Sequence, residues 1–238
     1  MLNSIKAAKI LFLDIETVPM YEFWEELEPE VQEMWAQKTQ NRRKELGEDP
    51  GIHYINNAGI WAEFGKIICI SVGFITKNDK IRIKSFYSHN EKSLLQDFAD
   101  LMNNHFYSSQ SLLCGHNIKE FDVPFIARRL LINQIELPNL FNLFGKKPWE
   151  IRHLDTMELW KFGDYKNYTS LGLLAHLFGI ETPKDDIDGS MVSRVYYKEN
   201  NLERIRAYCE KDVLAVAQVF RKMRREPLLE LDVVNEEN

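Results

Sequence analysis

The chain has 238 residues, of which 45% are hydrophobic and 12% aromatic, so we expect one large domain spanning residues 1–238. Its three widely spaced cysteines argue against a disulfide framework or a zinc ribbon, and they favour the reducing cytoplasm. The net charge of -6 argues against tight binding along a nucleic-acid duplex, which relies on lysine and arginine. It does not exclude contact with a few nucleotides, because bound cations would neutralise some of the acidic residues.

The first predicted element is a strand at residues 8–15 (AKILFLDI), because a nearly continuous apolar run is typical of a strand buried on both faces. Residues 21–47 are charged and helix-forming, acidic first and basic last, as the helix dipole favours. Gly47 and Pro50 are expected to end this segment. We interpret it as a helical insertion at about residues 21–60.

The apolar run 66–76 and the alternating run 80–87 flank a short polar turn and predict a β-hairpin. The later elements are expected in the order helix, strand, helix, edge strand, short helix and long amphipathic helix, at 91–106, 111–115, 122–133, 153–156, 170–178 and 202–223. This order of strands and helices indicates an α/β fold. No stretch is long and apolar enough to cross a bilayer, so no membrane partner is expected, and the last six residues are expected to be frayed.

Two acidic residues stand at the end of the first strand. Side chains of a strand alternate between its faces, so Asp14 and Glu16 point the same way. Two adjacent like charges repel each other, and the pair is costly unless a cation lies between them. The simple alternative is that both carboxylates are solvated where the strand leaves the core.

A second set of polar residues lies between the strand at 111–115 and the following helix. Asp122 directly precedes that helix, so it is a candidate metal ligand and also a candidate helix cap. His116 and Asn117 follow the strand end, where loops of an open α/β sheet bind ligands. Either residue alone is more often a structural hydrogen-bonding group.

The last predicted helix carries a third set. Tyr208 and Asp212 are four residues apart and therefore neighbours on one helix face. They lie at the edge of a core stripe formed by Cys209, Val213, Val216 and Phe220. An aspartate there needs a partner, because burying an unpaired carboxylate is expensive. For Asp155, another carboxylate at a strand end, we favour a structural role or a place behind the metal ligands.

These three segments, DIET at 14–17, HNIKEFD at 116–122 and YCEKD at 208–212, resemble in this order the three motifs of the DnaQ-like (DEDD) 3′–5′ exonucleases. The similarity is to the tyrosine subclass, and in particular to stand-alone relatives of the exonuclease domain of family B DNA polymerases. Ala207 occupies the position at which the histidine subclass carries its histidine. The resemblance covers most of the chain but not the helical insertion.

The resemblance implies an RNase H-like fold with a mixed central sheet of five or six strands flanked by helices. It also implies a two-metal mechanism with Mg²⁺ or Mn²⁺. The implied metal ligands are Asp14, Glu16, Asp122 and Asp212; Tyr208 would position the attacking water; and the implied substrate contacts are Thr17, His116, Asn117 and Phe121.

The expected activity is release of nucleoside monophosphates from single-stranded DNA or from 3′ overhangs. Two alternatives stay open at this point: a 3′–5′ RNA exonuclease that uses the same site, and a nucleic-acid-binding module without turnover. Four short basic clusters are expected mostly on solvated helix faces, with one or two bordering a substrate groove; they lie at 42–44, 128–129, 146–147 and 221–225.

Overall fold

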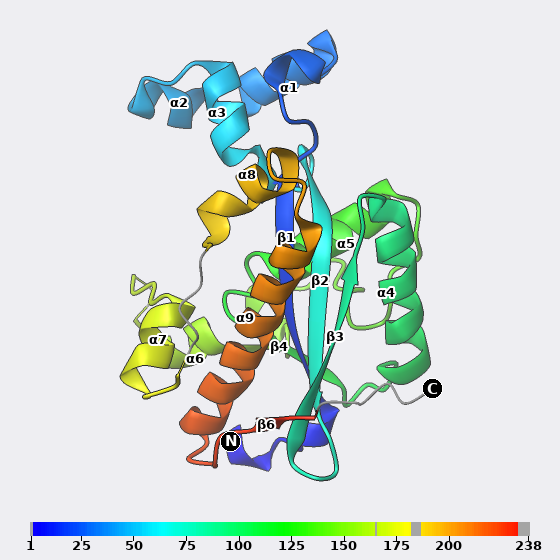
Figure 1. The fold of residues 1–238 in the computed structure, drawn as a ribbon, viewed down its shortest axis with the longest axis vertical. Coiled ribbons are helices and arrows are strands. Elements are labelled where there is room, and N and C mark those ends of the chain that lie inside the picture. Colours follow the sequence, from blue (N-terminus) through cyan, green and yellow to red (C-terminus); the bar gives the residue numbers. More distant parts are fainter. Residues whose placement is uncertain (1, 165, 182–186, 233–238) are drawn as a thin grey trace.

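The computed structural model describes residues 2–164, 166–181 and 187–232. Its centre is a six-stranded sheet in the order β5-β4-β1-β2-β3-β6, with helices on both faces (Figure 1). The strands are β1 (Ile10–Pro19), β2 (Gly65–Ile75), β3 (Lys80–Tyr87), β4 (Leu112–Gly115), β5 (Leu154–Asp155) and β6 (Glu230–Leu231). The β1–β2 and β2–β3 pairs are antiparallel and the other three pairs are parallel, which confirms the predicted mixed sheet.

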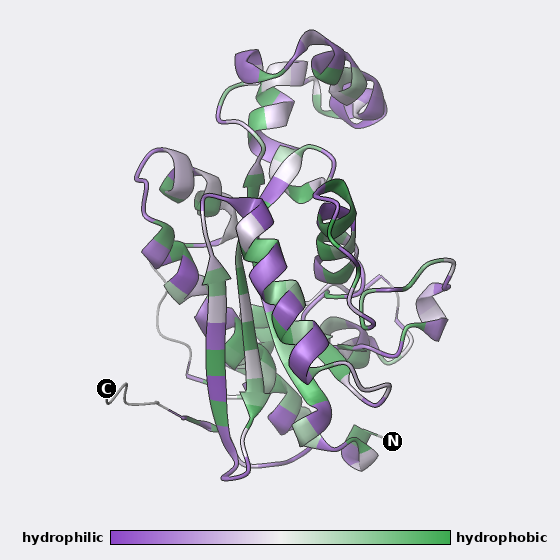
Figure 2. Ribbon diagram, turned by 90° about the vertical axis from the view of Figure 1, so that its right-hand side faces the viewer, coloured by the Kyte–Doolittle hydropathy of each residue, from purple (hydrophilic) through white to green (hydrophobic). Residues whose placement is uncertain are grey.

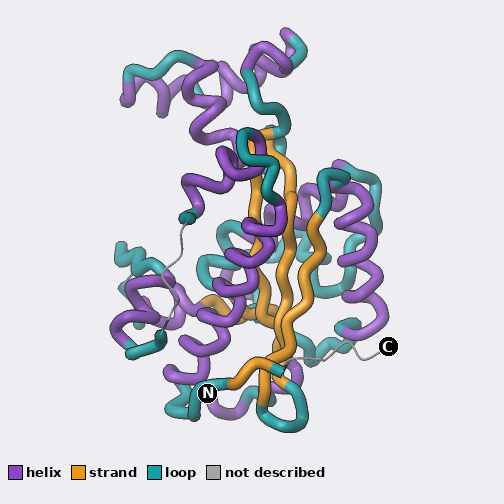
Figure 3. Tube along the Cα trace, in the orientation of Figure 1, coloured by secondary structure: helices purple, strands orange, loops and turns teal. Residues whose placement is uncertain are grey.

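The described helices are α1 (Pro29–Lys38), α2 (Gln40–Leu46), α3 (Pro50–Asn57), α4 (Glu91–His105), α5 (Asp122–Ile132), α6 (Thr156–Lys161), α7 (Leu171–Leu177), α8 (Val192–Tyr197) and α9 (Leu202–Met223). Two short 3₁₀ turns matter for the site: η4 (Ala58–Ile60) and η6 (Gly189–Met191). Figure 3 shows the long strands side by side through the middle of the molecule, with helices and loops around them and the short β6 at the lower end. No described helix is long and apolar enough to cross a membrane.

The side chains of β1 alternate between two separate cores. Leu11, Leu13 and Ile15 pack into the core that contains α4 and α5. Ile10 and Phe12 face the other way and pack against the apolar stripe of α9. Figure 2 shows hydrophobic and hydrophilic residues alternating along the helices that cover the sheet. This two-sided burial explains the nearly continuous apolar run in the sequence.

The inserted helices α1 to α3 lie beyond one end of the sheet (Figure 1). They surround Trp35, which is fully buried against Tyr54 and Phe64. Gly47 ends α2, which confirms the predicted end at this residue, and it does so in a left-handed conformation. The prediction that Pro50 ends the helical segment is wrong, because Pro50 opens α3, with Asp49 capping that helix by accepting from the N–H of Gly51 at 2.8 Å.

Other boundaries also differ from the predicted ones. β1 begins at Ile10 and continues to Pro19, four residues past the predicted end, because the residues after the acidic pair still pair with β2. The two-residue strand β6 and the six-residue helix α8 were not predicted, since such short elements carry little periodicity. The predicted frayed tail, residues 233–238, lies outside the described residues.

Candidate active site

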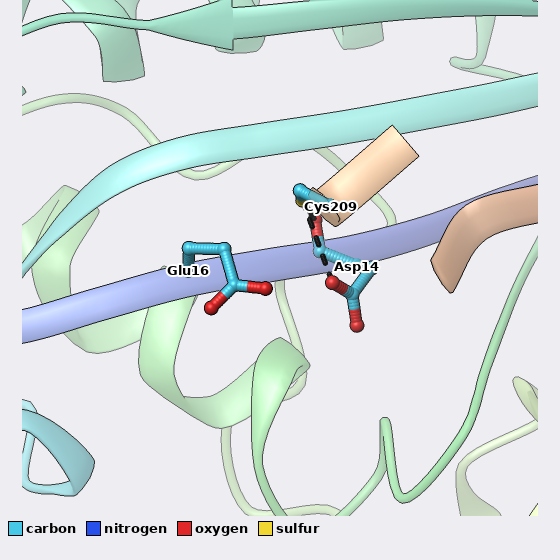
Figure 4. Close-up of side chains that lie close together, drawn as sticks. All are labelled: Asp14, Glu16 and Cys209. Atoms are coloured by element: carbon cyan, nitrogen blue, oxygen red, sulfur yellow. Dashed lines mark hydrogen bonds between the residues drawn. The ribbon is translucent and has the colours of Figure 1, made fainter. Parts of the chain in front are cut away.

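The acidic pair lies on the face of β1 that turns toward α9. Asp14 and Glu16 continue the row of Ile10 and Phe12, so they emerge where the apolar contact between β1 and α9 ends. Glu16 is buried and is followed by a register shift in the pairing of β1 with β2. The predicted common direction of the two carboxylates is therefore present (Figure 4).

Helix α9 brings a thiol to the acidic pair. Cys209 donates a hydrogen bond to Oδ2 of Asp14 at 3.4 Å and lies 3.5 Å from the Asp14 carbonyl oxygen (Figure 4). One atom each of Asp14, Glu16 and Cys209 lies within 4.8 Å of the others. Cys209 was interpreted from the sequence as a core residue only, since a small buried side chain in an apolar stripe has no other signature.

The remaining two aspartates approach from different elements. Asp122 is the buried first residue of α5, where its carboxylate accepts a backbone hydrogen bond from Ile15 of β1. Asp212, on α9, receives a hydrogen bond from the Tyr208 hydroxyl. Asp122 and Asp212 lie outside the triplet of Asp14, Glu16 and Cys209, but their charges act on it.

The electrostatics show that the four carboxylates share one region. Burial raises the pKa of Asp14 well above its usual range, and the charges of Asp122 and Asp212 raise it further. Burial also raises the pKa of Glu16, with Asp14 and Asp212 as the next causes. The pKa of Asp122 rises to about 7, chiefly through burial. Crowded carboxylates of this kind disfavour ionisation until a cation compensates their charge.

Tyr208 lies beside this group with its phenol protonated. Burial raises its pKa, and the nearby charges of Asp212, Glu16 and Asp14 act in the same direction. The hydroxyl is therefore a hydrogen-bond donor at neutral pH and not a general base.

The loop after β4 is held by Asp155. Its Oδ1 accepts from the N–H groups of Asn117 and Met157, both at 2.9 Å, and its Oδ2 accepts from that of Lys119 at 3.2 Å. Asp155 therefore caps α6 and fixes the loop that leads to Asp122. This is the structural role favoured from the sequence.

The structure gives His116 and Asn117 hydrogen-bonding partners within the protein. The ring nitrogens of His116 lie 2.9 Å from the Thr156 hydroxyl and 2.9 Å from the Thr169 carbonyl oxygen. Asn117 adopts a left-handed conformation, which asparagine tolerates better than most residues. Their predicted role as substrate contacts stays a prediction.

A cavity of about 950 Å³ adjoins the acidic pair and is lined by Glu16, Thr17 and Phe121, among others. The Thr17 hydroxyl donates to the carbonyl oxygen of Gly59 at 2.7 Å, so this hydroxyl can serve a substrate only as a hydrogen-bond acceptor. Phe121 packs against Phe125, with ring centres 5.5 Å apart, and reaches the cavity from the start of α5.

Residues 60–232 match the family described as predicted 3′–5′ exonucleases related to the exonuclease domain of PolB. The chain belongs to this family. No curated protein matches it in sequence. Among solved structures, the family B DNA polymerase of Pyrobaculum calidifontis is similar, with a TM-score of 0.52 and 13% identity over 90% of this chain and 24% of the polymerase. The Nibbler EXO domain of Aedes aegypti aligns with a TM-score of 0.40 and 13% identity over 97% of this chain and 85% of that domain.

Membership of this PolB-related exonuclease family identifies the chain as a 3′–5′ exonuclease and confirms the predicted RNase H-like fold. Nucleic acid is accordingly its substrate class, and divalent metals are the usual cofactors of such domains. The chain spans about a quarter of the polymerase it resembles. The match includes Asp122, Tyr208 and Asp212; Asp14 and Glu16 precede it, and the fold brings them to the same place.

Proposed function

We propose that residues 1–238 act as a single exonuclease domain that hydrolyses single-stranded DNA or 3′ overhangs and releases nucleoside monophosphates. The observation that carries the proposal is the convergence of four carboxylates, Asp14, Glu16, Asp122 and Asp212, where β1, α5 and α9 meet. Their charges raise one another's pKa values in a region that also opens into a large cavity.

The donor set fits two divalent cations. Carboxylate oxygens are hard ligands that suit Mg²⁺ or Mn²⁺, and the repulsion among the four groups is what bound cations would relieve. When bound, such cations supply activation of the attacking water and stabilisation of the leaving 3′ oxygen. The proposed ligands are Asp14, Glu16, Asp122 and Asp212.

Other residues of the chain would hold the reactants. Tyr208 is a protonated donor beside Asp212 and would orient the attacking water by a hydrogen bond. The backbone at Thr17 would contact the terminal 3′ hydroxyl, and Phe121 would support the terminal nucleotide from the cavity wall. His116 and Asn117 would complete the substrate contacts from the loop after β4. The three buried cysteines are free, which suits the cytoplasm.

The test is a time course with 5′-labelled single-stranded DNA, single-stranded RNA and duplexes with 3′ overhangs, with and without Mg²⁺ or Mn²⁺. We expect metal-dependent shortening from the 3′ end of the DNA substrates. Cleavage of RNA alone would instead indicate the RNA exonuclease. Thermal stabilisation by Mg²⁺ without cleavage of any substrate would indicate a binding module.

Variants test the residue assignments. Asp14→Asn and Asp212→Asn should lower kcat by more than the roughly 10–100-fold typical of residues that only support a metal ligand. Asp97→Asn is the matched control, because Asp97 is an exposed aspartate on α4. Full activity of Asp14→Asn would refute the two-metal assignment.

A further inference from the structure

The cavity beside Glu16 extends well beyond the four carboxylates. Most of its lining comes from three segments: the end of β1 with the residues that follow it, the end of α3 with η4, and η6 with α8; Phe121 reaches it from the start of α5. The first carries the acidic pair, and the second is part of the inserted helices, which lie almost entirely outside the family match at residues 60–232. Its volume of about 950 Å³ is near the top of the roughly 300–1,000 Å³ range of small-molecule pockets.

Both flanking segments are fastened to β1. On the side of the inserted helices, the carbonyl oxygen of Gly59 accepts the hydroxyl of Thr17 at 2.7 Å. On the side of α8, the Tyr197 hydroxyl donates to the carbonyl oxygens of Pro19 at 2.6 Å and Met20 at 3.1 Å. The cavity is therefore built into the fold next to Glu16.

The side of the inserted helices presents apolar side chains to this space. Ile55 and Ile60 line the cavity with 45% and 60% of their surface exposed, and Phe23 lines it with 47% exposed. Exposed apolar side chains gathered in one cavity are typical of a binding surface.

The side of α8 presents cations. Arg194 lines the cavity with a side chain that is 71% exposed. Lys198 also lines it, pairs with Glu22, and places its ammonium group 4.7 Å from the centre of the Phe23 ring. Arg194 also pairs with Glu199 at 3.7 Å, and the carboxylates of Glu16 and Glu22 line the same cavity. The two partly exposed cations therefore offer charged contacts to phosphates next to the apolar surface.

We propose that this cavity, called the groove from here on, binds the unpaired nucleotides that precede the 3′ end of a single-stranded substrate. Phe23, Ile55 and Ile60 would contact the bases, and Arg194 and Lys198 the phosphates. Bases within a duplex are already stacked and paired, so only a single strand can use the apolar side of the groove. The inference rests on the proposed function, and it assigns substrate selection to the helical insertion.

The experiment is fluorescence anisotropy with a labelled single-stranded DNA oligonucleotide and the full chain, with Ca²⁺ in place of Mg²⁺. We expect Ile55→Ser and Ile60→Ser to raise Kd about fivefold each, because they remove contacts with the bases. Ile52→Ser is the matched control. Ile52 lies on α3, like Ile55, and 57% of its surface is exposed, but it does not line the cavity, so Kd should be unchanged.

Salt dependence separates the two sides of the groove. Arg194→Gln should raise Kd and reduce the slope of log Kd against log salt concentration by about 0.7, the value for one phosphate contact on a single strand. Ile55→Ser should leave that slope unchanged. Blunt duplex DNA should show none of the penalties of the isoleucine variants.

The groove assignment is overturned if Ile55→Ser and Ile60→Ser bind single strands as tightly as the wild type, or if the wild type binds no oligonucleotide. If the wild-type chain binds single strands through these residues but cleaves no substrate, the proposed exonuclease activity is contradicted and the proposed binding groove is not. The two failures are therefore distinguishable.

Discussion

The thiol of Cys209 on α9 donates a hydrogen bond to Oδ2 of Asp14 on β1 across 3.4 Å. This contact ties the helix that carries Tyr208 and Asp212 to the strand that carries the acidic pair. Burial raises the pKa of Cys209 well above its usual range, so the sulfur stays protonated and remains a donor. The neutral thiol thus orients the Asp14 carboxylate without compensating its negative charge, so a cation can still bind there.

Removal of this donor should weaken catalysis moderately. Cys209→Ala deletes one hydrogen bond, worth about 1 kcal/mol, so we expect kcat on single-stranded DNA to fall about fivefold. Cys209→Ser restores a donor and should recover most of the activity. Cys114→Ala, at another buried cysteine, is the control. Equal kcat for Cys209→Ala and the wild type would mean that the thiol contributes packing alone.

Tyr208→Phe should be less damaging than loss of a carboxylate. The change removes the hydroxyl that donates to Asp212 but no proposed metal ligand, so we expect kcat to fall about tenfold while the thermal shift produced by Mg²⁺ is kept. Steady-state kinetics and thermal unfolding in Mg²⁺ measure the two effects. Loss of the Mg²⁺ shift in Tyr208→Phe would contradict a role limited to orienting water.

The part of the site that could be predicted depends on local geometry. The alternation of side chains along a strand places Asp14 and Glu16 on one face, and helical spacing makes Tyr208 and Asp212 neighbours. Cys209 could not be assigned to the site, because its role depends on Asp14, which lies 195 residues away in sequence.

The cations of the groove and the burial of one basic cluster could not be predicted either, because both depend on residues that are distant in sequence or carry no local pattern. Of the two cations that line the groove, Arg194 lies on a six-residue helix without a readable pattern and Lys198 directly follows that helix. None of the four predicted basic clusters lines the groove. Arg129, in one of those clusters, was expected on a solvated face but is buried. Its partner Glu91 lies 38 residues earlier, and no local pattern joins the two.

Breaking this buried ion pair should destabilise the fold. Arg129 donates to both carboxylate oxygens of Glu91, at 2.9 and 2.5 Å, and their side chains are only 4% and 9% exposed. Arg129→Met leaves the Glu91 charge buried without its cation, so we expect the free energy of unfolding in urea to fall by about 3–5 kcal/mol. Lys38→Met breaks the exposed pair with Glu63 and should cost less than about 1 kcal/mol. Equal losses in the two variants would contradict this account.

His153 should make stability fall in acid. Its ring is buried between β4 and the loop that contains Leu140: Nδ1 accepts from the N–H of Leu113 at 3.3 Å, and Nε2 donates to the Leu140 carbonyl oxygen at 2.9 Å. Burial is the main cause that lowers its pKa from 6.5 to about 4. A protonated Nδ1 would face a donor, which explains why the folded chain keeps the ring neutral.

The sign of the effect follows from linkage. Above pH 6.5 the ring is neutral in both states, so its contribution to stability is fully present there. As the pH falls from 6.5 to about 4, the unfolded chain binds the proton first, and roughly 3 kcal/mol of stability is lost.

The raised pKa values of Asp14 and Glu16 make stability change with pH in the opposite direction. The measurement is therefore the difference in pH dependence between wild type and His153→Gln. Urea unfolding at several pH values should show a smaller acid loss in His153→Gln, whereas His105→Gln, at an exposed histidine, should follow the wild type. Parallel pH profiles of His153→Gln and wild type would show that protonation of this ring does not drive the acid loss.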